Sequence, residues 1–195
     1  MVSNALGSVL TGDHCPSRVG GTQEVLGYVG RLAYPEANFW VSKARKLSPA
    51  YAAAELLWYL SHSRSLEMIR AYAPSYDDYS DGYGIYGPRF EGQLGVIVRL
   101  LKKNPTTRRA VVQLWQPEDL CNQESTDLPC TLSLQFILRG DRLHLVVNMR
   151  SNDIFRGMPY DIFCFTCIQM MFAGELDVAV GDYQHQAGSL HLYTK

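Results

Sequence analysis

The sequence lacks the features that mark several classes of protein. No apolar run reaches the roughly 18 residues that a membrane-spanning helix needs, and the N-terminus has no apolar core of a signal peptide. Eighteen Lys and Arg stand against 19 Asp and Glu, so the formal net charge is −1. This balance argues against a nucleic-acid coat or a polybasic membrane patch, which need clustered positive charge. It is compatible with a few arginines gathered around one small anion.

The cysteines and histidines form neither a disulfide framework nor a complete set of metal ligands in the sequence. The five cysteines are an odd number and do not form a disulfide framework, so we expect reduced thiols in a cytoplasmic protein. Cys164 and Cys167 have the spacing of a metal ligand pair, but they lie in an apolar stretch without a second pair. The five histidines show no ligand spacing either. We therefore predict core thiols and no metal.

The length of 195 residues and a hydrophobic content of 47% predict one domain over residues 1–195. The patterns predict an α+β domain in which a mostly buried sheet packs against central helices. The expected elements are turns and short strands over 1–30, helices over 49–62, 66–72, 92–103 and 162–172, a long structured loop over 75–92, and strands over 110–115, 131–138, 143–149 and 190–193.

Two isolated residues are candidates for chemistry. Cys130 follows Pro129 at the start of a predicted strand, where a thiol is held rigidly and can face a cleft as a nucleophile. The alternative is that it is a small buried hydrophobic residue, as lone cysteines more often are. Glu55 stands alone among Ala, Leu and Trp. Because a buried carboxylate is costly unless it is paired or functional, Glu55 is either catalytic or part of a structural ion pair.

Arginines stand at the edges of the predicted strands. Arg108 and Arg109 precede one strand, Arg150 and Ser151 follow another, and Arg18 lies in the glycine-rich start. Converging guanidinium groups suit a phosphate, whose oxygens they bind in pairs. The alternative is that these arginines are ordinary solvated surface side chains.

The order of these pieces resembles the thymidylate synthase superfamily over most of the chain. Six motifs in the family's order make the resemblance specific: Glu55-Leu-Leu-Trp58-Tyr-Leu60, Tyr86-Gly87, Arg108-Arg109, Pro129-Cys130, Arg150-Ser151-Asn152-Asp153 with Gly157 and Pro159, and Gly181-Asp182 to His191-Leu192-Tyr193. The resemblance implies a thymidylate synthase-like mixed sheet packed against central helices, and a homodimer formed through the sheet. It also implies a further C-terminal segment that helps to close the site; we expect that segment to be absent from these 195 residues.

Two departures point to one branch of the superfamily. Asp161 stands where the synthases read the base with an Asn, and Thr131 follows the nucleophile where His is common. Together with the stretch 148–153, they resemble the cytidylate or deoxycytidylate (CMP/dCMP) hydroxymethylases. An Asn amide complements uracil N3–H and O4, whereas a carboxylate suits the N4 amino group of cytosine and can hold a proton on N3.

The resemblance implies a transferase. The thiolate of Cys130 would add to C6 of the cytosine, and C5 would take the one-carbon unit of 5,10-methylenetetrahydrofolate, a co-substrate. Water would complete the 5-hydroxymethylcytidylate, with Glu55 organising the water and the proton transfers. The alternatives are methylation of a uridylate by a synthase-type reaction and a non-catalytic nucleotide-binding member of the fold.

The resemblance also assigns binding roles. Asp161 would read the base with Asn152 as a helper, and His191 and Tyr193 would hold the sugar. The phosphate would be held by Arg18, Arg108, Arg109, Arg150 and Ser151, two of the arginines coming from the other subunit. The folate or its surroundings would be contacted by Asp153, Gly157 and Tyr86. The expected partners are a pyrimidine nucleoside monophosphate, folate and a second copy of the chain, with no nucleic acid or membrane.

Overall fold

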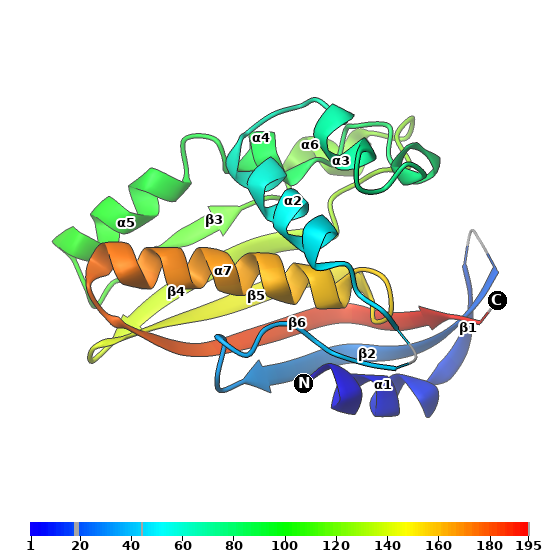
Figure 1. Ribbon diagram of the computed structural model, residues 1–195, viewed down its shortest axis with the longest axis horizontal. Coiled ribbons are helices and arrows are strands. Elements are labelled where there is room, and N and C mark those ends of the chain that lie inside the picture. Colours follow the sequence, from blue (N-terminus) through cyan, green and yellow to red (C-terminus); the bar gives the residue numbers. More distant parts are fainter. Residues whose placement is uncertain (18–19, 44, 195) are drawn as a thin grey trace.

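The computed structural model describes residues 1–17, 20–43 and 45–194. In this part of the chain six strands form one mixed sheet in the order β1-β2-β6-β5-β4-β3 (Figure 1). Their bounds are β1 (Asp13–Ser17), β2 (Gly20–Leu32), β3 (Val111–Gln113), β4 (Thr131–Arg139), β5 (Arg142–Asp153) and β6 (Ala179–Tyr193). Neighbouring strands are antiparallel except β5 and β6, which are parallel. The fold is therefore α+β with a mixed sheet, as predicted.

The parallel pair requires a crossover, and the longest helix supplies it. Helix α7 (Met158–Leu176) follows β5, packs along β5 and β6, and returns the chain to the start of β6 (Figure 1). Helix α2 (Pro49–Leu60) packs across α7. It begins at Pro49 because the Ser48 hydroxyl accepts a hydrogen bond from the Tyr51 N–H. The remaining helices are α1 (Val2–Leu10), α3 (Glu67–Arg70), η1 (Tyr76–Asp78), α4 (Tyr86–Phe90), α5 (Leu94–Lys103) and α6 (Pro117–Cys121).

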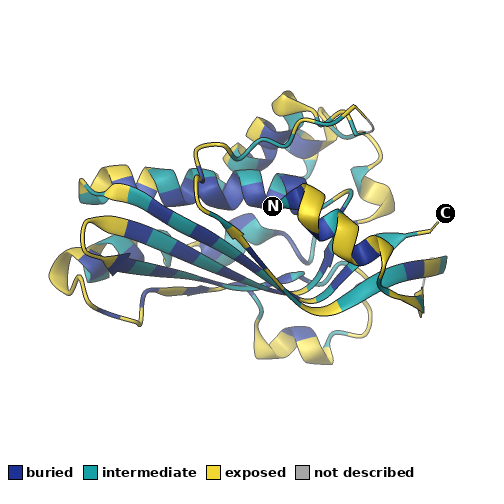
Figure 2. Ribbon diagram, turned by 90° about the horizontal axis from the view of Figure 1, so that it is seen from below, coloured by how far each residue is buried: buried dark blue, intermediate teal, exposed yellow. Residues whose placement is uncertain are grey.

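The two faces of the sheet differ in what covers them. Buried and half-buried residues alternate along the long strands, as Figure 2 shows. The buried set, which includes Val147 and Tyr183, belongs to the core on which α7 packs. On the opposite face lie half-buried polar side chains, and two apolar residues of β2, Leu26 and Val29, are 74% and 64% exposed. One face thus holds the core, and the other carries half-buried and exposed side chains.

A buried ion pair ties the segment over 75–92 to the approach to Cys130. The Arg89 guanidinium of α4 donates two hydrogen bonds of 2.8 Å to the Asp119 carboxylate of α6, and the side chains are 9% and 1% exposed. Burial acts to raise the pKa of Asp119, but the bonds from Arg89 and the Gln116 N–H lower it. Arg89 also donates to the carbonyl of Leu114. Helix α6 lies just before the loop that leads to Cys130, so this pair fixes both segments.

Some elements differ from the sequence predictions. The predicted turns over 1–30 are wrong for residues 2–10, which form α1, because Val2, Ala5 and Val9 share one helix face and bury it. The loop over 75–92 contains α4, and the predicted strand over 190–193 is the end of the 15-residue β6. Arg150 and Ser151 lie inside β5 rather than at its edge.

Replacing Arg89 with Met is expected to destabilise the fold by about 3–5 kcal/mol, because it leaves the Asp119 carboxylate buried and unpaired. Urea unfolding measures the change. The control is Arg70→Met, which breaks an ion pair with Asp77 whose side chains are 46% and 51% exposed and should cost less than about 1 kcal/mol. Adding Asp119→Asn to the first variant should recover part of the loss. Equal effects of Arg89→Met and Arg70→Met would contradict the role of the buried pair.

Candidate active site

Cys130 lies at a cavity of about 120 Å³, directly before β4. The cavity is lined by Trp58, Tyr59, Tyr76, Gly84, Ile85, Tyr86, Asp127, Leu128, Pro129 and Cys130. Most of these residues come from α2 and from the segment over 76–86, which the Arg89–Asp119 pair holds in place. A half-buried thiol at an aromatic-lined cavity has the setting of a nucleophile, which a thiol in the closed core lacks.

Arg150 of β5 fixes the backbone around Cys130. Its guanidinium donates to the carbonyls of Pro129 at 2.9 Å and of Leu128 at 3.0 Å, and its backbone N–H donates to the Cys130 carbonyl at 2.8 Å. Burial raises the pKa of the Cys130 thiol, the positive charge of Arg150 lowers it, and the charges of Asp161 and Asp127 raise it again. The thiol therefore carries its proton at neutral pH unless these charges change.

Two buried carboxyl groups, Glu55 of α2 and Asp161 of α7, lie on helices that pack on each other. Glu55 accepts a hydrogen bond from the Tyr51 hydroxyl at 2.9 Å. Burial raises the pKa of Glu55 to about 7, against the opposite effect of hydrogen bonds from Tyr51, Cys164 and Tyr59. Burial and then the charge of Glu55 raise the pKa of Asp161 to about 8. Both groups can therefore gain or lose a proton near neutral pH, as general acids and bases must.

Asp161 is joined to the sheet through side chains that the sequence analysis did not connect. The Asn152 amide donates from Nδ2 to Asp161 Oδ2 at 2.8 Å, and its Oδ1 lies 2.9 Å from His185 Nε2. His185 Nδ1 lies 2.8 Å from the Tyr183 hydroxyl. All four side chains are buried, and burial lowers the pKa of His185 to about 3. Asn152, His185 and Tyr183 thus form a neutral chain that ends at Asp161.

The residues proposed for the sugar and the folate lie at the same end of β5 and β6. His191 Nδ1 is 3.5 Å from the Ser151 hydroxyl, and its ring packs edge-on against Tyr193 with centroids 5.1 Å apart. Asp153 Oδ1 accepts the backbone N–H groups of residues 155 and 156, so it shapes the turn before α7. A Cβ at Gly157 would lie 3.2 Å from the Asn152 amide nitrogen, so a side chain there would press on Asn152.

Tyr86 lies on the Cys130 side of the site. Its hydroxyl accepts the backbone N–H of Thr131 at 3.1 Å and lies 3.0 Å from the Thr131 hydroxyl. Thr131 directly follows Cys130, so Tyr86 helps to hold the strand start that carries the thiol. Tyr86 lines the cavity as well.

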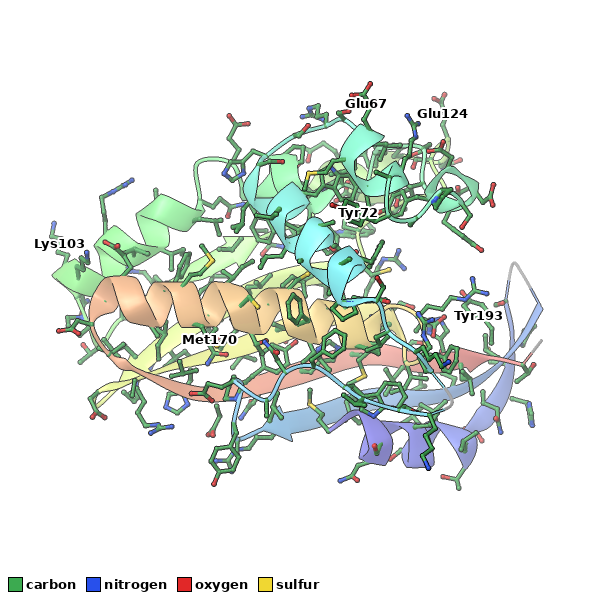
Figure 3. The ribbon with its side chains drawn as sticks, in the orientation of Figure 1. Glu67, Tyr72, Lys103, Glu124, Met170 and Tyr193 are labelled. Carbon is green, nitrogen blue, oxygen red and sulfur yellow. The ribbon has the colours of Figure 1, made fainter. Side chains whose placement is uncertain are left out.

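Two predicted phosphate ligands, Arg108 and Arg109, lie away from the group of residues around Cys130 and Asp161. Arg108 and Arg109 are exposed and precede β3, where Val111 pairs with Gln135 of β4, about 17 Å along that strand from Cys130 at 3.3 Å per residue. Figure 3 shows Lys103, the end of the preceding helix, and Tyr193 at opposite ends of the molecule. Arg18 lies outside the described residues. Within one chain, that group therefore contains Arg150 and Ser151 but neither Arg108 nor Arg109.

Residues 7–195 match the family model for thymidylate synthase. The chain belongs to the thymidylate synthase family. This family carries out one-carbon transfer to a pyrimidine nucleotide with methylenetetrahydrofolate as co-substrate. The described residues contain no group of three or more metal-ligating side chains and no helix long and apolar enough to cross a membrane.

Several residues of the candidate site were not singled out from the sequence. Asp127 lines the Cys130 cavity, and it accepts a hydrogen bond from Ser80 that joins the two loops. Tyr51 and Tyr59 contact Glu55 from the same helix. The spacing of Tyr51 and Glu55, four residues apart, is a signal that helix periodicity offers. His185 and Tyr183 are two residues apart and therefore lie on the same face of β6. This signal can be recognised only if the full length of that strand is predicted.

The raised pKa values of Glu55 and Asp161 predict a stability that falls with pH. The folded state binds these two protons more tightly than the unfolded chain, whose carboxyl pKa values are about 4. The contribution is fully present below that pH and is lost as the pH rises through 7 and 8. We expect the melting temperature without ligand to fall by at least about 3 °C between pH 5 and pH 9, on the order of 1 kcal/mol.

Calorimetry at a series of pH values measures this slope. Glu55→Gln and Asp161→Asn should each flatten it, because the amide has no proton to lose in this range. Glu67→Gln, a change to an exposed carboxylate on α3, is the control and should leave the slope as in the wild type. If neither Glu55→Gln nor Asp161→Asn changed the slope, other groups would control the pH dependence of stability.

Proposed function

We propose that this chain is a transferase that moves the one-carbon unit of 5,10-methylenetetrahydrofolate to C5 of CMP or dCMP and gives the 5-hydroxymethylcytidylate. The supporting observation is the environment of Asp161. Its carboxyl is buried, its pKa is raised to about 8, and it carries one hydrogen bond, from Asn152, among the described residues. A carboxyl of this kind is neutral or negative near pH 7 and can both give and accept a hydrogen bond.

This carboxyl complements the edge of cytosine. Cytosine presents the N4 amino group as a donor and N3 as an acceptor, and a protonated Asp161 offers an acceptor oxygen and an O–H donor in return. Uracil presents a donor at N3 and an acceptor at O4. A carboxylate offers no donor to O4, and a neutral carboxyl offers one only when its proton is on the oxygen that faces O4. Because such mismatches leave buried polar groups unpaired, the discrimination can be large.

Cys130 is the proposed nucleophile. Its Sγ forms a bond to C6, the C5–C6 electron pair moves to C5, and C5 forms the bond to the one-carbon unit, which the folate supplies. The C5 proton then leaves to a base, and the bond between the one-carbon unit and the folate nitrogen breaks, so tetrahydrofolate departs and an exocyclic methylene remains. Water adds to that carbon, and the bond from Sγ to C6 breaks as the C5–C6 double bond forms again. The aromatic side chains of Trp58, Tyr76 and Tyr86 around the cavity suit flat heterocyclic rings.

Glu55 is the proposed group that handles the protons. With a pKa of about 7 it can take a proton from water or return one at neutral pH. Its hydrogen bond from Tyr51 holds one carboxylate oxygen on the side of α2. In this proposal Glu55 also orients the water that distinguishes hydroxymethylation from methylation.

The phosphate, sugar and folate would lie over the surface next to the cavity, because a cavity of about 120 Å³ is smaller than a typical ligand pocket of about 300 Å³ or more. Ser151 and Arg150 would hold the phosphate, and His191 and Tyr193 the sugar. Asp153, Gly157 and Tyr86 would shape the folate side. In a homodimer through the face of the sheet opposite α7, Arg108 and Arg109 would reach the phosphate of the partner's site.

The reaction is tested by mass spectrometry of the products with methylenetetrahydrofolate and CMP, dCMP, UMP or dUMP in separate reactions. We expect a hydroxymethylated cytidylate from the wild type. Asp161→Asn should shift the preference towards the uridylates, because an amide offers one donor and one acceptor. A methylated uridylate together with dihydrofolate from the wild type would contradict the proposal in favour of a synthase. Nucleotide binding without any product would favour a binding protein.

The shared site is tested by mixing two inactive variants, Arg109→Ala and Cys130→Ala. A heterodimer has one site with an intact thiol and an intact partner arginine. Equal mixing should therefore restore about one quarter of the wild-type sites, since half of the dimers are mixed. Each variant alone, carried through the same exchange, is the control. No recovery after tagged subunits have been shown to exchange would contradict a site built from two subunits.

A further inference from the structure

With the Asn152 amide oriented as it is in the structure, the hydrogen-bonded chain from β6 to Asp161 has one direction that satisfies every group. Asn152 donates its amide N–H to the Asp161 carboxyl, so its carbonyl oxygen is the atom that faces His185. An amide oxygen only accepts, so His185 Nε2 must carry the hydrogen. His185 is fully buried and neutral, and therefore Nδ1 carries none and accepts from the Tyr183 hydroxyl. All three hydrogen bonds thus point towards Asp161.

This direction makes the two oxygens of Asp161 different. Oδ2 already accepts the Asn152 N–H, whereas Oδ1 accepts no hydrogen bond among the described residues. A proton on the carboxyl therefore belongs on Oδ1, with Oδ2 remaining an acceptor. Rotating the Asn152 amide by 180° would reverse this assignment, but it would place two acceptors, the Asn152 oxygen and Asp161 Oδ2, against each other unless Oδ2 were protonated. The Nε2–H of His185 holds the amide against that rotation.

We propose that His185 is a positioning residue for base selection, which acts through Asn152 to keep Asp161 Oδ2 as an acceptor and Oδ1 as the oxygen that carries the proton. This inference rests on the proposed cytidylate function and adds the device that sets its specificity. The N4 amino group of cytosine then lies against Oδ2, and N3 accepts from Oδ1. The O4 atom of uracil would meet the acceptor Oδ2 and lose its hydrogen bond.

A purely structural histidine makes a different prediction. If His185 only filled space and satisfied buried polar atoms, its loss would lower the stability of the fold and weaken the binding of all four nucleotides by the same factor. If it sets the direction of the chain, its loss lets the Asn152 amide rotate, and the ratio of cytidylate to uridylate affinity falls. The ratio is therefore the informative measurement, and stability is not.

Calorimetric titration of the full chain with CMP, dCMP, UMP and dUMP, without folate, measures that ratio. His185→Leu should reduce the wild-type preference for cytidylate about tenfold, the size expected for one buried hydrogen bond. His185→Gln places an amide N–H near the position of Nε2 and should retain the preference to within about threefold. Phe172→Leu, a change in the same core that involves no hydrogen bond, is the control and should lower the melting temperature with the ratio unchanged.

The tautomer can be measured directly in the wild type, so the test does not depend on the variants folding. Nitrogen-15 NMR of the histidine rings at pH 7, with His185→Gln used for assignment, should show His185 neutral with its hydrogen on Nε2. A hydrogen on Nδ1 would overturn the inference, since the chain would then run away from Asp161. A wild type that prefers cytidylate while His185→Leu keeps the full ratio would overturn the inference alone. A wild type that binds all four nucleotides alike would overturn the proposed function with it.

Discussion

The structure depends on the burial of two carboxyl groups, Glu55 and Asp161, where α2 crosses α7 above the sheet. Carboxylates in such a place are usually paired with a cation. Here the described residues supply hydroxyl, thiol and amide groups in place of a cation, and no ion pair reaches either carboxyl. The charged forms are therefore disfavoured and both pKa values rise towards neutral pH. The arrangement lowers the stability of the fold at high pH. It also places one exchangeable proton beside the Cys164 thiol and a second one where its loss acts on the pKa of Cys130.

Much of the fold follows from local sequence patterns. Strands β4 and β5 alternate in burial around the Gly140 turn, and α2 and α5 carry clear helix signals, so all four were predicted within a few residues, apart from the four at the end of β5. Only the last residues of the long strand β6 were predicted. Polar residues such as Gln184 and Gln186 lie on its half-buried face and interrupt the apolar pattern. The start of the chain was misjudged because Gly7 lies in a helix, where its conformational freedom is not used.

The candidate site also has residues that the sequence predicts and residues that it does not. Cys130, Glu55 and Asp161 were predicted from their place in an ordered set of motifs. The charge of Asp161 acts on the pKa of Cys130, and the charge of Glu55 acts on the pKa of Asp161. The link from Asp161 to His185 was not accessible from sequence. In the β5–β6 ladder His185 pairs with Val147 and Asn152 pairs with Leu190, yet the two side chains meet over the buried face. Only the three-dimensional path of the paired strands brings their polar atoms together.

On the proposed function, base recognition and nucleophile activation are coupled through charge. The negative charge of Asp161 raises the pKa of Cys130, and the positive charge of Arg150 lowers it. With cytosine bound, one proton is shared between Asp161 and N3, so the pair carries no net charge whichever atom holds the proton. With uracil, Oδ1 must accept N3–H while Oδ2 accepts the Asn152 N–H, so Asp161 must be a carboxylate, and its charge remains beside the thiol. The wrong base would then lose a hydrogen bond and also meet a less reactive Cys130, so one carboxyl group would discriminate at both binding and chemistry.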